Sequence, residues 1–106
     1  MKQLEKQRRF QGYDLHQVHA SKHAYCYAKS YKGTLVSFEV FERRIEQPRT
    51  RIGGNYSAFT EPFERYPGEK AFGRWAWDEK TFEWAMQKVA EIEARFNKLE
   101  TVSIAA

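Results

Sequence analysis

The stretch HAYCYAKSYKGTLVSFEVFERRI, residues 23–45, decides the fold. Its two halves, 23–31 and 34–45, are rich in Tyr, Val, Phe and Thr, the residue types that strands favour. Between them lies Lys32-Gly33, a short segment with a glycine. The pattern therefore predicts an antiparallel β-hairpin.

Two turns are compatible with Lys32-Gly33. A two-residue loop requires a positive φ at Lys32, which is unfavourable for a residue with a Cβ atom. A type I turn over 30–34 followed by a G1 bulge places only Gly33 in the left-handed region, and we favour it. This register pairs small with large residues on one face, namely Ala28 with Val36, Cys26 with Phe38, and Ala24 with Val40. Cys26 is then a buried small apolar residue rather than a reactive thiol.

The opposite face of the hairpin carries aromatic and basic side chains. They are Tyr25, Tyr27, Lys29, Phe41 and Arg43. Rings with cationic neighbours form the kind of platform on which single-stranded nucleic acids stack, so an open face predicts a nucleic-acid site. The alternative is that these rings pack beneath the N-terminal strand or the 46–70 segment, since tyrosine is common at half-buried positions.

Arginines that follow the hairpin extend this basic surface. They are Arg43, Arg44, Arg49 and Arg51. Guanidinium groups in one stretch can follow phosphates along a strand. The net charge of +4 permits a nucleic acid or an acidic protein as partner but does not require one, because a modest positive charge also serves solubility.

Residues 81–99 have the pattern of an amphipathic helix that Thr81 can cap. Its apolar positions form one stripe: Phe82, Ala85, Met86, Val89, Ile92, Phe96 and Leu99. The stripe must cover the hairpin face that carries Val36, Phe38 and Val40. We therefore expect an α+β fold in one domain spanning 1–106, with a three- or four-stranded antiparallel sheet and this helix packed on one face.

The remaining segments have weaker patterns. Residues 13–20 and 72–77 are expected to form further strands. Residues 2–11 predict either a short helix that Gly12 ends or a frayed basic arm. The segment 46–70 is irregular, because proline and glycine punctuate it.

Trp75 and Trp77 alternate across Ala76, which places them on the same side of an extended segment. There they can clamp the start of the helix, or they can form a patch for a protein partner or a second copy of the chain, since Trp is a common interface anchor.

The sequence contains no grouping typical of catalysis. His16, His19 and His23 have a spacing that one helix face could use for a metal, but a strand and turn scatter the rings. No nucleophile motif or phosphate loop is present. We therefore expect no enzymatic activity, no metal and no cofactor.

Features of the sequence also bear on location. Cys26 is the only cysteine, five of the first ten residues are charged, and no long apolar run occurs. These features predict a cytoplasmic protein with no membrane contact.

Three segments carry a resemblance to a known group of proteins. They are FEVFERRI (38–45), ERYPGEKAFGRWAW (64–77) and TFEWAMQKV (81–89). In these the chain resembles small uncharacterised proteins of phages and mobile elements, which have a Phe-Glu-Val-Phe strand, a Tyr-Pro turn, a Phe-Gly-x-x-Ala-Trp segment and a Thr-capped helix. The resemblance covers about half of the chain and implies a cytoplasmic accessory role, with no catalytic residues to assign.

Two functional hypotheses follow from these observations. The first is a nucleic-acid-associated accessory protein that uses the hairpin rings and the arginines. The second is a protein-interaction module, such as a homodimer, formed through a sheet edge or through Trp75 and Trp77.

Overall fold

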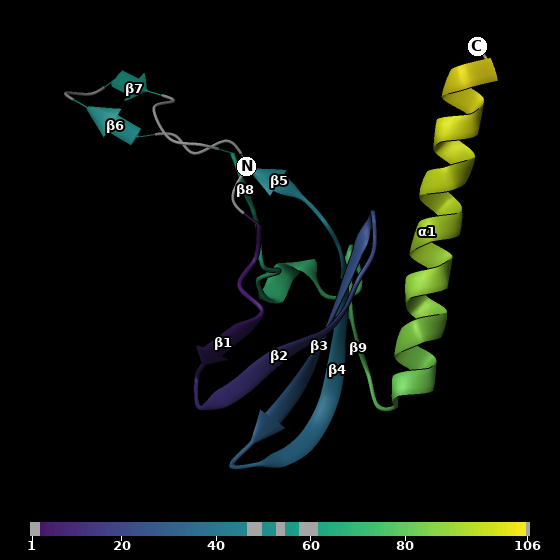
Figure 1. Cartoon of the computed structure of the whole chain (residues 1–106). Helices are drawn as coiled ribbons and strands as arrows, with labels where there is room; N and C mark the ends of the chain where they lie inside the picture. The colour runs from purple at the N-terminus through teal and green to yellow at the C-terminus, as the bar shows by residue number, and fades with distance from the viewer. Residues whose placement is uncertain (1–2, 47–49, 53–54, 58–61, 106) are drawn as a thin grey trace.

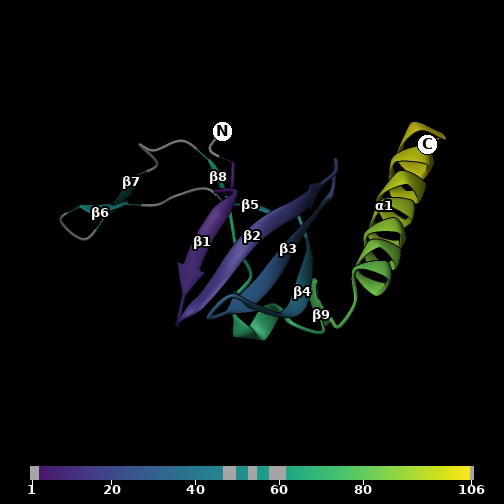
Figure 2. The same ribbon diagram turned by 60° about the horizontal axis from the view of Figure 1, so that its bottom comes forward.

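Five strands form one antiparallel sheet in the computed structural model, with neighbours in the order β1–β2–β3–β4–β9. They are β1 (Gln7–Phe10), β2 (Tyr13–Ala20), β3 (Ala24–Tyr31), β4 (Thr34–Glu42) and β9 (Ala76–Glu79). A long helix, α1 (Phe82–Ala105), follows β9 and lies along one side of the sheet (Figures 1 and 2). The α+β prediction is therefore confirmed, and the sheet has one strand more than the larger number expected.

The structure describes residues 3–46, 50–52, 55–57 and 62–105, with the backbone alone for 50–52, 55–57 and 101–105. Two short strand pairs accompany the sheet. β5 (Ile45–Glu46) pairs with β8 (Phe63–Glu64), and β6 (Thr50–Ile52) pairs with β7 (Asn55–Ser57). A single turn of 3₁₀-helix, η1 (Glu69–Ala71), lies on the side of the sheet away from α1 (Figure 1).

The N-terminal segment contains a strand, so the expectation of a helix or a frayed arm over 2–11 is wrong. β1 pairs with β2 through a two-residue turn at Gln11-Gly12, whose φ angles are 51° and 83°. Gly12 supplies the left-handed conformation that such a turn needs, and the pairing with β2 satisfies backbone groups that an isolated helix turn would leave open. β2 covers the residues 13–20 that its pattern predicts.

The β3–β4 turn is the two-residue loop and not the favoured G1 bulge. Tyr31 and Thr34 pair directly, and Lys32 and Gly33 have φ angles of 50° and 82°. This turn twists in the same sense as the two strands, and the match offsets the conformational free energy of the left-handed Lys32. A register shift then occurs between Lys29 and Ser30 on β3, so that Lys29 faces Ser37 while Ser30 faces Leu35.

The shift leaves the expected faces intact although every expected partner is wrong. Cys26 faces Val40, Ala28 faces Phe38, and Ala24 faces Glu42, each displaced by two residues from the expected partner. A displacement of two preserves the alternation of side chains across the sheet. Val36 is the exception, because it lies at the irregularity and is 41% exposed.

The face toward α1 contains the helix-side core, formed by Ala24, Cys26, Phe38, Val40, Ala85, Val89 and Ile92. The middle of the predicted stripe is thus buried against β3 and β4, while Phe82 and Leu99 at its ends are exposed. Thr81 caps the helix as expected, since its Oγ1 accepts a hydrogen bond of 3.1 Å from the backbone N–H of Trp84.

The opposite face, which we call the far face, is covered by the chain between β8 and β9. It contains the far-side core, formed by Leu15, Tyr25, Tyr27, Phe41, Ala71, Trp75 and Ala76, with Leu4, Tyr66 and Phe72 packed against it. The predicted strand over 72–77 begins at Ala76 instead, because Gly73, with φ 87°, turns the chain and donates to the Ala76 carbonyl at 2.8 Å. In the described part of the chain, no helix has the length and hydropathy needed to cross a membrane.

Candidate nucleic-acid interface

The rings that were expected to face outward are buried. Tyr25, Tyr27 and Phe41 are 2%, 0% and 0% exposed. Tyr66 lies edge-on to both Tyr27 and Phe41, and Trp75 lies edge-on to Phe41. The expectation of an open stacking platform is wrong, because the chain that returns to form β9 covers these rings. The alternative, burial beneath the N-terminal strand or the 46–70 segment, is correct for Tyr66, and Ala71 and Trp75 extend the covering beyond residue 70.

Hydrogen bonds fix the two buried phenols. The Tyr25 hydroxyl donates to Glu64 Oε1, and the Tyr27 hydroxyl donates to the Glu5 carbonyl at 2.6 Å and accepts from Gln17 Nε2 at 3.0 Å. Burial, followed by the hydrogen bond to Glu64, raises the pKa of Tyr25 well above its usual range. Burial likewise raises the pKa of Tyr27. Both side chains therefore stay neutral and are part of the core.

Arg43 is bound inside the protein. Its Nε lies 2.7 Å from Glu64 Oε2, its guanidinium donates to the Ser21 carbonyl at 2.9 Å, and it stacks on the Tyr25 ring at 4.6 Å. These contacts connect β8 to the sheet and hold the guanidinium against Glu64 and the Ser21 carbonyl.

Arg44 is more accessible, with its side chain 52% exposed. It pairs with Glu42 at 3.1 Å and lies 4.7 Å from the Trp75 ring. Arg49 is outside the described residues, and of Arg51 the structure gives only the backbone, in β6. The structure therefore does not test a continuous arginine surface from 43 to 51.

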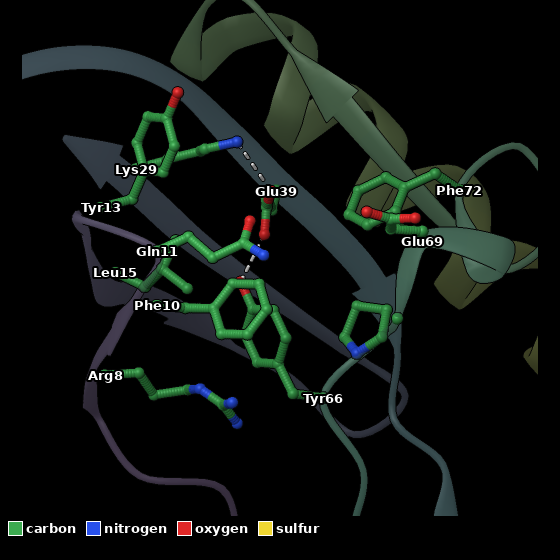
Figure 3. A pocket seen from close by; sticks show the side chains of 12 residues that line it. Arg8, Phe10, Gln11, Tyr13, Leu15, Lys29, Glu39, Tyr66, Glu69 and Phe72 are labelled. Atoms are coloured by element: carbon green, nitrogen blue, oxygen red, sulfur yellow. Dashed lines mark hydrogen bonds and ion pairs between the residues drawn. The ribbon is translucent and has the colours of Figure 1, made fainter. Parts of the chain in front are cut away.

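Lys29 lies in a pocket on the far face. The pocket has a volume of about 390 Å³ and is enclosed by β1, β2, β3, β4 and the segment 66–72 (Figure 3). Aromatic residues that line it are Phe10, Tyr13, Tyr66 and Phe72, and charged residues are Arg8, Lys29, Glu39 and Glu69. A volume of about 300 to 1,000 Å³ with a few convergent polar groups is typical of ligand sites.

An ion pair lies within this pocket. Lys29 Nζ is 3.5 Å from Glu39 Oε2, and the Tyr66 hydroxyl donates to Glu39 Oε1 at 2.6 Å. Figure 3 shows both groups directed at the Glu39 carboxylate. Burial, followed by the charge of Glu39, raises the pKa of Tyr66 well above its usual range, so this phenol remains a donor. The carboxylate is therefore held in one orientation.

Arg8 is a residue that sequence reasoning missed. Its guanidinium lies 4.3 Å from the centroid of the Tyr66 ring, and among the described residues it has no carboxylate partner. Arg9 points to the other side of β1, where it pairs with Asp14 at 3.7 Å. The signal for this arrangement is the two-residue turn at Gln11-Gly12, which marks 7–10 as a strand whose alternate residues face opposite sides.

Trp75 and Trp77 do not form a common patch. Trp75 belongs to the far-side core and is 9% exposed, whereas Trp77 packs against the helix-side core. The expectation that they share one side is wrong, because the turn at Gly73 continues through Trp75 and the strand begins only after it.

The three histidines lie apart. His16 is near Gln7, and His19 pairs with Cys26 across β2 and β3. His23 lies between two carboxylates of α1, with Nδ1 2.8 Å from Glu93 and Nε2 3.0 Å from Glu100. No group of three or more acidic, histidine or cysteine side chains in the described ranges is arranged to hold a metal ion.

Comparison of the chain with models of protein families, with curated proteins and with solved structures finds no match. The resemblance to small phage and mobile-element proteins therefore stays a prediction.

Proposed function

We propose that this chain is a non-enzymatic accessory protein that binds single-stranded nucleic acid in the far-face pocket. The position of Arg8 supports this proposal most strongly, because its guanidinium lies on the Tyr66 ring without a carboxylate partner in the described chain. A cation of this kind beside aromatic rings is the combination that tracks a backbone and stacks its bases. The proposal moves the interface from the hairpin rings to the β1 side of the same face.

The shape of the pocket favours an unpaired strand over a duplex. Its aromatic residues line a concave site, and a base can reach them only if it leaves its stack. Duplex DNA keeps its bases stacked and offers only base edges and phosphates, so its base faces cannot enter such a pocket. Single strands are therefore the expected ligand.

The test compares two neighbouring arginines. Arg8→Ala and Arg9→Ala remove the same charge from adjacent positions of β1, one facing the pocket and one facing away. Fluorescence anisotropy with a labelled single-stranded oligonucleotide, at about 50 and about 200 mM salt, gives the affinity and its salt dependence. Arg8→Ala is expected to weaken binding about tenfold at the lower salt, the loss of one charge-assisted contact of about 1.4 kcal/mol.

In a plot of the logarithm of affinity against the logarithm of salt concentration, the negative slope should become shallower by about 0.7 for Arg8→Ala, because one phosphate contact is lost. Arg9→Ala should leave the affinity within a factor of about two, since Arg9 does not line the pocket and pairs with Asp14 instead. Equal losses in the two variants would indicate diffuse charge attraction, and no salt-dependent binding by the wild type would refute the proposal.

A second candidate function is protein binding, including homodimer formation. It is favoured by two large rings exposed at the start of α1, Phe82 at 48% and Trp84 at 59%. Exposed aromatic side chains are frequent interface anchors. Sedimentation velocity of the wild type and of Trp84→Ser tests this function: a dimer that the substitution dissociates would support it, and a concentration-independent monomer would exclude the homodimer.

A further inference from the structure

The Lys29–Glu39 pair gives the pocket a directional pattern of hydrogen-bonding groups. The Lys29 side chain is 22% exposed and that of Glu39 is 11% exposed, so both are shielded yet line the cavity. Tyr66 holds one carboxylate oxygen, and the Tyr13 ring lies 4.4 Å from Lys29 Nζ. A fixed donor therefore lies beside a fixed acceptor that retains lone pairs, since a carboxylate can accept about four hydrogen bonds.

Two further aromatic side chains line the pocket and offer apolar contact to a planar ligand. Within the described chain, Phe10 and Phe72 make no ring–ring or cation–π contact, and both line the pocket. Phe10 is 56% exposed, so one of its faces is open to a stacking partner. Arg8 lies at the same site and is available to a phosphate.

We infer that the pocket takes a guanine base, with its Watson–Crick edge on Lys29 and Glu39. The guanine edge presents an acceptor, O6, followed by two donors, N1–H and N2–H. Lys29 can donate to O6 while the Glu39 carboxylate accepts from both nitrogens. This inference rests on the proposed function, because it specifies which base the same pocket would hold.

The other bases fit this pattern less well. Adenine and cytosine each offer the carboxylate a single donor group, from the exocyclic amine, and uracil or thymine places its only edge donor between two acceptors. One of those acceptors would oppose the Glu39 carboxylate. Guanine therefore makes one more charge-assisted hydrogen bond than any other base, which is expected to discriminate by about tenfold.

The test is a ranking of mononucleotides on the wild-type protein by isothermal titration calorimetry. GMP is expected to bind about tenfold more tightly than AMP, CMP or UMP. IMP, which retains O6 and N1–H but lacks the N2 amine, makes one hydrogen bond fewer and should bind about tenfold more weakly than GMP. A parallel arm compares an oligothymidine carrying one central dG with the same strand carrying one central dA.

Two substitutions locate the preference. Glu39→Gln keeps the shape and an oxygen for Tyr66 but removes the second acceptor, so the GMP preference should be lost. Glu69→Gln changes the charge of the same pocket at its rim and should leave the preference intact. The wild-type ranking needs no substitution, so it decides the question even where Glu39→Gln fails to fold.

The outcomes separate the two proposals. Equal affinity for all bases, with salt-dependent binding of the oligonucleotides, overturns the guanine site and leaves the strand-binding function standing. A preference for GMP without any binding of oligonucleotides supports the guanine site and contradicts strand binding. Binding of neither class overturns both.

Discussion

Three carboxylates, those of Glu39, Glu42 and Glu64, lie buried against a cation. Glu39 pairs with Lys29, Glu42 with Arg44 and Arg95, and Glu64 with Arg43. Burying a charge is costly unless it is paired and hydrogen-bonded, so the folded state requires these ion pairs. Glu39 differs from the other two because it also lines a pocket, where a ligand can reach it.

At the residue scale, the burial of Cys26 predicts that the stability of the fold depends on pH. Burial raises the pKa of its thiol to about 12, whereas an unfolded cysteine has a pKa of about 8.5. The folded state therefore binds the proton more tightly, and the stability from this group is present in full below about pH 8.5 and is lost as pH rises toward about 12. The loss is about 1.4 kcal/mol for each unit of pH.

Urea unfolding of the wild type and of Cys26→Ala at pH values from about 8 to about 10 measures this effect. The free energy of unfolding should fall more steeply for the wild type, because tyrosines and lysines titrate alike in both proteins. Parallel curves would show that the thiol is not shielded. In the folded wild type we also expect a thiol reagent to react only as fast as the protein opens.

At the scale of elements, the turns set the register of the sheet. Gly33 has a φ of 82°, and a Cβ added there would meet nothing within 4 Å. Gly68 is equally open but has an ordinary φ of −87°. Because an added Cβ would be uncrowded at both positions, alanine substitutions at the two glycines differ only in backbone strain.

Gly33→Ala is expected to lower the free energy of unfolding by about 1–2 kcal/mol, the cost of a left-handed residue with a Cβ. Gly68→Ala should be neutral or raise it by up to about 1 kcal/mol, since it reduces the entropy of the unfolded chain. Chemical denaturation of both variants checks this pair. A loss of the same size in both would mean that the turn is not left-handed.

The middle of the apolar stripe on α1 is buried, and the two ends of the stripe are exposed. Ile92 is 2% exposed in the helix-side core, whereas Leu99 is 59% exposed. Ile92→Ala should cost about 2–5 kcal/mol through lost burial and the cavity it leaves. Leu99→Ala should change stability by about 0.5 kcal/mol or less. Thermal or urea unfolding tests the contrast, and similar costs for both would contradict the packing of α1.

The hairpin, the helix and its cap could be predicted from sequence because each depends on local pattern: alternation over 23–45, the apolar stripe after Thr81, and Thr81 itself. β1 was missed because QRRF has no apolar alternation and becomes a strand only by pairing with β2. The register was missed because the turn is shorter than expected and a register shift at Val36 follows it in the hairpin. The alternation of residues within a single strand does not reveal such a shift in its pairing with the neighbouring strand.

At the scale of the whole molecule, the sheet is covered on both faces, and the coverings differ. α1 lies over β3, β4 and β9, while the far face is closed by the chain that runs from β8 to β9 (Figures 1 and 2). β4 is therefore buried on both sides from Ser37 to Glu42. The pocket lies beside this covering, next to β1 and β2.

This arrangement explains why the candidate site was only partly foreseen. Lys29 was recognised as a basic residue on the correct face, but the rings beside it belong to the core. Arg8, Phe10 and Tyr66 come from segments whose position relative to β3 depends on the strand order and on the turn at Gly73. The turn at Gln11-Gly12 marks 7–10 as a strand, but the placement of that strand near the 66–72 segment has no local sequence signal.

A ¹⁵N–¹H correlation titration of the wild-type protein with a short single-stranded oligonucleotide tests the central claim most directly. Binding in the far-face pocket should shift the amide signals of residues 8–11, of Lys29 and of residues 68–72, and leave those in the middle of α1 unchanged. Shifts centred on Phe82 and Trp84, or no shifts at any ratio of strand to protein, would contradict the claim.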